Sequence, residues 1–98
     1  MKYSYEINPR SVELGGGWRL RLLEDGEETG GGVFPVALDD PQVGITWWND
    51  CTEAARAHWL VVAKSAVAVD AYHAHLLAEA YANAETTAYE WLDSRGSV

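Results

Sequence analysis

Basic residues are missing from a long continuous stretch of this chain: there is no lysine or arginine between Leu22 and Ala55. The same stretch holds eight carboxylates, which match the whole formal net charge of −8. An ionised side chain is costly to bury without a partner, and none lies nearby in the sequence. We therefore expect these residues to face water or a basic partner: Glu24, Asp25, Glu27, Glu28, Asp39, Asp40, Asp50 and Glu53.

Long apolar runs and paired cysteines are also lacking. No apolar run approaches the ~20 residues that span a bilayer, and Met1–Arg10 carries alternating polar residues in place of the apolar core of a signal peptide. Cys51 is the only cysteine, so it forms no internal disulfide. With 98 residues and 48% hydrophobic content, the composition predicts one soluble globular domain over residues 1–98, in the reducing cytosol.

The sign of the charge excludes one class of partner. Residues 1–21 carry a net charge of +2 and residues 56–98 a net charge of −2, so the middle of the chain carries −8. A field of that sign repels phosphate backbones and attracts basic surfaces. We expect no direct binding of nucleic acid, and a basic protein that itself binds nucleic acid is the better partner.

The patterns of residues that carry catalysis or bind metals are absent as well. His73 and His75 are two residues apart, so on a helix they point about 200° apart and cannot share one ion with each other, while His58 lies on another predicted helix. Cys51 has no basic neighbour and lies among carboxylates, which argues against a thiolate nucleophile. No pair of carboxylates lies in the apolar setting that tunes a general acid. We expect no enzyme, no metal site and no cofactor.

The first third of the chain is patterned as strands. Alternation of apolar and polar residues predicts strands over residues 3–8 and 18–24. Asp25-Gly26 is typical of a hairpin turn, in a loop that can extend to Glu28, and a third strand follows over residues 32–38. Pro35 favours an edge position for that strand.

Two glycine triplets, Gly15–Gly17 and Gly30–Gly32, flank the second strand and the turn. They resemble a phosphate-binding loop only superficially, because no Gly-Lys-Ser/Thr and no strand-to-helix junction follows. We interpret them as turns or strand bulges.

The second half lacks glycine and proline from Ile45 to Arg95 and is rich in alanine, which predicts helices. We expect one over residues 50–64, capped by Asp50 or Thr52, and one over residues 70–94, capped by Asp70.

The fold class expected from these elements is α+β, with a three-stranded antiparallel sheet in the N-terminal half packed against two C-terminal α-helices. Four aromatic residues are expected to meet between the layers: Trp18, Phe34, Trp59 and Trp91. Trp47 and Trp48 are adjacent, so at most one belongs to the core and the other is a candidate hydrophobic anchor for a partner. The alternative is that both rings cover the sheet edge.

The acidic residues remain as the functional signal. Glu24, Asp25, Glu27 and Glu28 place four charges within five residues at a hairpin tip, which can imitate the charge density of DNA. Asp39, Asp40, Asp50 and Glu53 extend this patch if they fall on the same side. Here the chain as a whole resembles the small phage-encoded anti-CRISPR proteins. The resemblance is carried by its size and acidity, by the glycine-flanked segments Gly15–Trp18 and Gly30–Pro35, and by the alanine-rich helix that closes in Glu90–Asp93.

Within that group the chain is similar to inhibitors of type I systems that act as DNA mimics. The resemblance implies that it occupies the basic DNA-binding or PAM-reading surface of a Cascade-type surveillance complex, in the cytoplasm of the bacterial host cell. We expect a monomer. The alternative is a protein-interaction module of a phage or mobile element, antitoxin-like or an assembly protein, that is acidic only for solubility.

Overall fold

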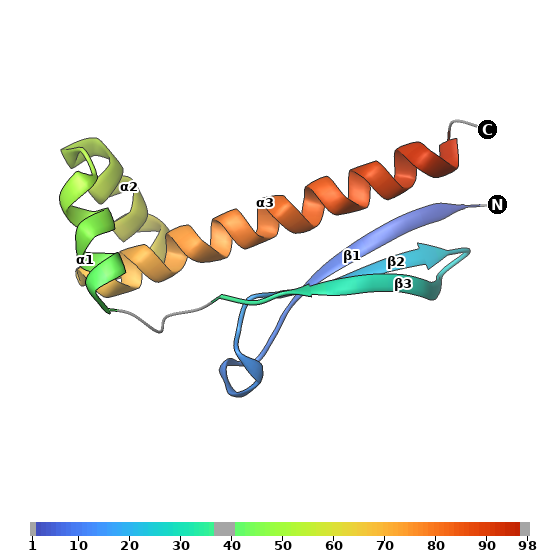
Figure 1. Cartoon of the computed structure of the whole chain (residues 1–98), viewed down its shortest axis with the longest axis horizontal. Coiled ribbons are helices and arrows are strands. Elements are labelled where there is room, and N and C mark those ends of the chain that lie inside the picture. Colours follow the sequence, from blue (N-terminus) through green and yellow to red (C-terminus); the bar gives the residue numbers. More distant parts are fainter. Residues whose placement is uncertain (1, 37–40, 97–98) are drawn as a thin grey trace. The chain divides into compact units, whose positions relative to one another are not determined.

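A computed structural model of the chain describes residues 2–36 and 41–96, with only the backbone described at Val12. The chain is α+β, as expected, with one helix more than expected (Figure 1). Its elements in chain order are β1 (Tyr3–Pro9), the short 3-10 helix η1 (Val12–Leu14), β2 (Trp18–Glu24), β3 (Glu27–Phe34), α1 (Pro41–Asp50), α2 (Glu53–Ala63) and α3 (Ala68–Gly96).

The chain divides into two compact units. The sheet unit contains the three strands and the part of α3 from Glu79 onward. The helical unit contains α1, α2 and the part of α3 up to Ala78. Among the described residues, no helix combines the length and the apolar character needed to cross a membrane.

The strands form an antiparallel sheet in the order β1-β2-β3. Both turn residues between β2 and β3 have positive φ, 52° at Asp25 and 86° at Gly26, as a two-residue primed turn requires. This tight turn lets pairing begin at once, so β3 starts at Glu27 and not at residue 32. The strand also ends before Pro35, and residues 37 and 38 of the predicted strand lie outside the described residues.

The core of the sheet unit forms where α3 lies along one face of the sheet (Figure 1). Leu20 and Leu22 of β2 are buried against Ala84 and Ala88 of α3. The two alanines are four residues apart, so they share one face of the helix and allow it to approach the strand closely. Aromatic and aliphatic side chains pack around this cluster: Tyr5, Ile7, Phe34 and Trp91.

Trp59 does not join this core, contrary to the aromatic cluster expected from the sequence. It belongs to the helical unit, where its ring meets the edge of His75 at 5.1 Å and contacts His58 at 4.7 Å. In the sheet unit, Trp18 instead packs edge-to-face on Tyr81. Trp59 on α2 therefore packs against the beginning of α3.

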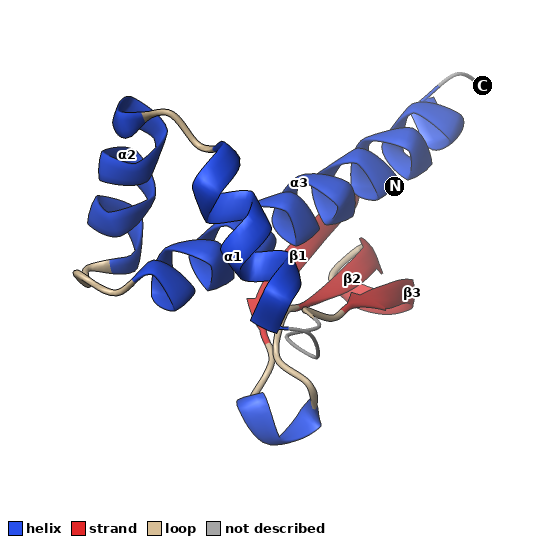
Figure 2. Ribbon diagram, turned by 60° about the vertical axis from the view of Figure 1, so that its left-hand side comes forward, coloured by secondary structure: helices blue, strands red, loops and turns tan. Residues whose placement is uncertain are grey.

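In the helical unit, α1 and α2 lie beside the first turns of α3 (Figure 2). α1 begins at Pro41, because proline is tolerated in the first turn of a helix. Its last residue is Asp50, so Asp50 does not cap the next helix. Thr52 does: its Oγ1 accepts a hydrogen bond from the Ala55 backbone N–H at 3.1 Å.

The break between α2 and α3 falls where the sequence indicates it. α2 ends at Ala63 and is followed by its C-cap, Lys64, which adopts the left-handed conformation with φ 54°. α3 begins at Ala68, two residues before the predicted start, and so Asp70 lies in its first turn instead of at its cap. The Asp70 carboxylate accepts a hydrogen bond from the Ser65 hydroxyl at 2.6 Å, which ties the connection to the new helix.

Candidate functional site

The eight predicted acidic residues are divided between the two units. Glu24, Asp25, Glu27 and Glu28 belong to the β2–β3 hairpin, whereas Asp50 ends α1 and Glu53 begins α2. Asp39 and Asp40 lie outside the described residues.

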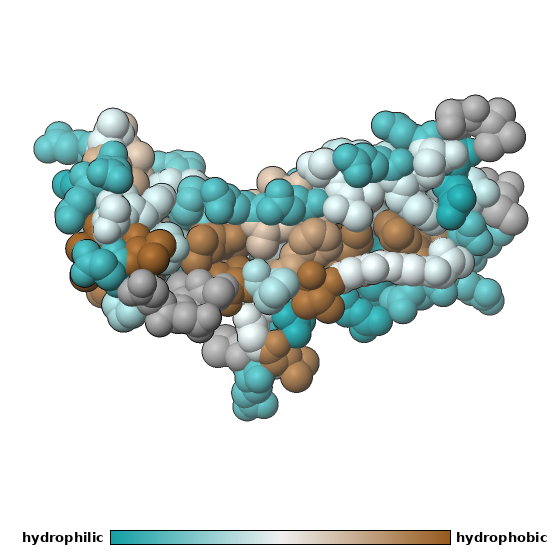
Figure 3. Space-filling model, viewed as in Figure 1, coloured by the Kyte–Doolittle hydropathy of each residue, from teal (hydrophilic) through white to brown (hydrophobic). Residues whose placement is uncertain are grey.

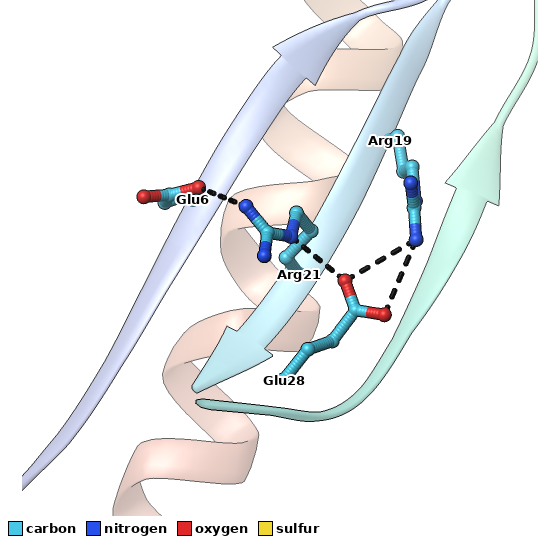
Figure 4. A network of polar contacts seen from close by, with 4 residues as sticks. All are labelled: Glu6, Arg19, Arg21 and Glu28. Atoms are coloured by element: carbon cyan, nitrogen blue, oxygen red, sulfur yellow. Dashed lines mark hydrogen bonds and ion pairs between the residues drawn. The ribbon is translucent and has the colours of Figure 1, made fainter. Parts of the chain in front are cut away.

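Glu28 is engaged by the sheet itself. Its carboxylate accepts a hydrogen bond from Arg21 Nε at 2.7 Å and from Arg19 at 3.2 Å, and Arg21 also donates to Glu6 at 2.7 Å (Figure 4). These side chains come from three neighbouring strands and lie on one face of the sheet (Figure 4). The hydrogen bond from Arg21 holds the pKa of the Glu28 carboxyl below its ordinary value. Glu28 is therefore part of a structural network and is already neutralised.

The other three carboxylates of the hairpin lie at its tip. Glu24 and Glu27 are directly opposite each other in the strand register, on either side of the turn. Asp25 Oδ1 accepts a hydrogen bond from the Lys2 backbone N–H at 2.8 Å, but no cationic side chain is involved. Among the described residues, none of these three carboxylates forms an ion pair.

The alternation of side chains separates the tip from Glu28. Glu28 pairs with Leu23 and shares the face of the sheet that carries Arg19 and Arg21, whereas Glu24 and Glu27 project from the opposite face. The four hairpin carboxylates expected to form one cluster therefore form a cluster of three at the tip and one structural residue.

Trp47 and Trp48 have different environments in the helical unit. The Trp47 ring stacks on His75 at 4.9 Å and also contacts Tyr72 at 5.4 Å. The Trp48 ring lies under the Arg56 guanidinium, 5.2 Å from the ring centre. Arg56 Nε also donates to the Trp48 carbonyl oxygen at 3.0 Å, which fixes this ring at the surface.

Trp48 forms one wall of an apolar cleft between α1 and the start of α3. The cleft has a volume of about 320 Å³. Its lining contains no charged side chain: Pro41, Gly44, Ile45, Trp48, Ala68, Val69 and Tyr72. Gly44 permits this arrangement, because a Cβ atom there would lie 3.0 Å from the Tyr72 ring.

Two of the histidines pack against tryptophan rings in this unit. His75 contacts the rings of Trp47 and Trp59, and His58 contacts Trp59 as well. Within residues 2–36 and 41–96, no group of three or more His, Cys, Asp or Glu side chains is placed to hold a metal ion.

No family model, curated protein or solved structure matches this chain. The two candidate sites are therefore defined by their geometry: the acidic tip of the hairpin and the apolar cleft of the helical unit.

The cleft was not predicted from the sequence, because α1 was not among the expected helices. A signal was present nonetheless. Pro41, Gly44, Ile45 and Trp48 are spaced at three and four residues, as one face of a helix requires. Gly44 and Pro41 lower the apparent helix propensity, which conceals this spacing.

Proposed function

We propose that this protein is a non-catalytic inhibitor that binds a basic protein surface through the tip of its β2–β3 hairpin. The resemblance of its sequence to DNA-mimicking anti-CRISPR proteins suggests the partner: the DNA-binding surface of a Cascade-type surveillance complex. In that function the tip carboxylates take the place of DNA phosphates and prevent the target DNA from binding.

The observation that carries the proposal is the direct pairing of Glu24 with Glu27. Like charges placed opposite each other destabilise a pair of strands, and the opposing Cβ atoms are only about 5 Å apart. Asp25 adds a third charge between them. The sheet supplies arginines to Glu28 and Glu6 but none to this pair. The Glu24–Glu27 pair lowers the stability of the hairpin, and no interaction within the described residues offsets this loss. Such a pair is typical of residues that bind a partner.

The charge of the sheet unit supports the same proposal. Its described residues include ten acidic and five basic side chains, a net charge of −5. Such a field accelerates the approach of a basic surface. The hairpin tip is then the point where the densest part of that charge reaches the partner.

The test is a tip variant that reverses the charge of the tip and keeps the turn. We choose Glu24→Lys, Asp25→Asn and Glu27→Lys together, because asparagine tolerates the left-handed conformation of residue 25 and two lysines retain the like-charge pair. We expect the concentration that half-inhibits target-DNA binding by a purified type I surveillance complex to rise by about tenfold or more.

The matched control reverses charge elsewhere by the same amount. Glu13→Lys, Glu79→Lys and Asp70→Asn act on exposed residues outside the hairpin. This control variant should inhibit within about threefold of the wild type, since only long-range attraction is reduced. If the tip and control variants inhibit equally, the acidity serves solubility and the tip is not the site.

A single substitution separates binding from stability. Glu27→Lys places a lysine opposite Glu24 and converts repulsion into attraction, so the hairpin should gain about 0.2–1 kcal/mol in free energy of unfolding. The same change should weaken the inhibition. A variant that is both more stable and a better inhibitor would contradict the proposal.

A further inference from the structure

The helical unit buries little of its own apolar surface. In the described part of the chain, α1 and α2 contain no buried residue. The buried side chains that α3 contributes to this unit are small, at Ala71 and Ala74. Aliphatic residues of this unit remain more than half exposed, among them Ile45 at 52% and Val69 at 59%. Exposed aliphatic side chains gathered in this way mark an interaction surface.

The cleft and the exposed aliphatic side chains at and beside its walls form one apolar surface. Ile45 of α1 and Val69 of α3 line the cleft and are themselves among the most exposed aliphatic residues of the helical unit. Val67, 53% exposed, directly precedes the cleft residue Ala68. Apolar residues are visible together over α1 and the first turns of α3 (Figure 3). The same surface thus contains a cleft and exposed aliphatic side chains that are small enough to enter a cleft of this size.

The charge of this unit determines what can cover the cleft. Residues 41–78 contain three acidic residues, Asp50, Glu53 and Asp70, and two basic ones, Arg56 and Lys64, so their net charge is −1. The cleft itself is lined by no charged residue. A basic partner therefore gains nothing here, and an apolar surface without charge repulsion is favoured. A near-neutral apolar surface of this kind is typical of contacts between identical subunits.

We propose that this surface binds a second copy of the chain in a two-fold symmetric dimer, in which Ile45 and Val69 of each copy enter the cleft of the other. A two-fold interface must be self-complementary, because the same patch is used by both subunits. The combination of hollow and protruding side chains on one patch meets that requirement. The dimer differs from the monomer expected from the sequence, and it is independent of the proposed function because the hairpin tip belongs to the sheet unit.

The experiment measures the mass of the full chain in solution by sedimentation equilibrium from micromolar to millimolar concentration. We expect the wild type to dimerise reversibly. Val69→Glu should raise the dissociation constant by about thirty-fold or more, the effect of losing an interface hot spot. The substitution is compatible with the fold, since Val69 is exposed and a carboxylate in the first turn of a helix is favourable.

The matched control is Val61→Glu on α2. Val61 is 75% exposed and does not line the cleft, so the same substitution there should leave the dissociation constant within about threefold of the wild type. Circular dichroism of both variants checks that the helices are retained. Equal weakening by both variants would mean that added charge, and not the cleft, controls association, and would overturn the proposal.

A wild type that stays monomeric at every concentration overturns the proposal as well. In that case an apolar dye tests whether the cleft of the monomer binds an apolar group from another molecule. If the monomer binds 1-anilinonaphthalene-8-sulfonate and Val69→Glu abolishes the binding, the cleft takes an apolar group from another molecule and not from a second copy. Inhibition by the hairpin tip is measured separately, so either proposal can fail without the other.

Discussion

Glu28 and Glu27 are neighbours of the same residue type, yet the sheet places them in different surroundings. Alternation along β3 places Glu28 beside two arginines and Glu27 opposite another glutamate. The sequence identifies both as surface acids but does not distinguish them, because the distinction depends on the strand register. The position of the turn sets that register, and a loop extending to Glu28 would have placed all four hairpin acids together.

The structural engagement of Glu28 predicts how it titrates. Since the hydrogen bond from Arg21 lowers the pKa of the Glu28 carboxyl, its contribution to stability is present above the ordinary glutamate pKa and is lost as the pH falls through the lowered value. In Arg21→Gln the Glu28 pKa should rise toward its ordinary value. Side-chain carbon NMR titration measures it, with Arg56→Gln as the control that leaves it unchanged. Identical Glu28 titrations in wild type and Arg21→Gln would contradict the network.

At the scale of elements, the glycine triplet of β3 is part of the sheet and not of a loop. The register shifts between Leu22 and Leu23, which pair with Gly30 and Glu28 respectively and leave Thr29 as the extra residue of a bulge. From the sequence we interpret Gly30–Gly32 as a turn or a bulge, but all three are paired with β2 and the bulge lies at the preceding residue, Thr29. Gly31 has φ 155°, and a Cβ atom there would collide with the Leu20 carbonyl oxygen.

This geometry predicts unequal tolerance within the triplet. Gly31→Ala should lower the free energy of unfolding by about 1–3 kcal/mol, because it adds strain and a backbone collision. Gly30→Ala is the matched control: its Cβ would make an ordinary contact, 3.7 Å from the Leu22 side chain, and should change stability by no more than about 0.5 kcal/mol. Urea denaturation measures both. If both variants lost the same free energy of unfolding, the strain and the collision predicted for Gly31 would not explain the effect.

At the scale of the whole molecule, the charge is unevenly shared. The described residues of the sheet unit carry −5 and those of the helical unit −1. The acidic hairpin and the apolar cleft thus present two surfaces of different chemistry, one electrostatic and one hydrophobic.

Binding through these two surfaces should respond differently to salt. Inhibition through the hairpin tip should weaken as sodium chloride increases, since exposed charges are screened beyond about 10 Å at 0.1 M. Dimerisation through the cleft should hold or strengthen, because hydrophobic association involves no counter-charge. The half-inhibitory concentration and the dimer dissociation constant, each measured at low and high salt, test this. Inhibition that is insensitive to salt would move the contact from the tip to an apolar surface such as Trp48.

The sequence alone predicts the class of fold, the presence of three strands, a break before α3 and Thr52 as one of two candidate caps. These features depend on the periodicity of apolar residues, on turn residues and on helix caps, and each of these involves only a few neighbouring residues. It missed α1, because Pro41 and Gly44 conceal a helix that tertiary contact with Tyr72 stabilises. The prediction that Trp59 packs against the sheet was wrong. An apolar stripe on a helix shows that this side is buried, but it does not show which element covers it.

Which acids remain unpaired, and where the apolar cleft lies, follow from the folded structure. Ion pairs such as Glu28 with Arg21 join adjacent strands, and the cleft joins α1 to α3. The ion pair depends on the strand register and the cleft on how two helices pack, and composition and local spacing specify neither. The acidic stretch between Leu22 and Ala55 is therefore a property of the sequence, whereas the carboxylates of it that are available to a partner are a property of the fold.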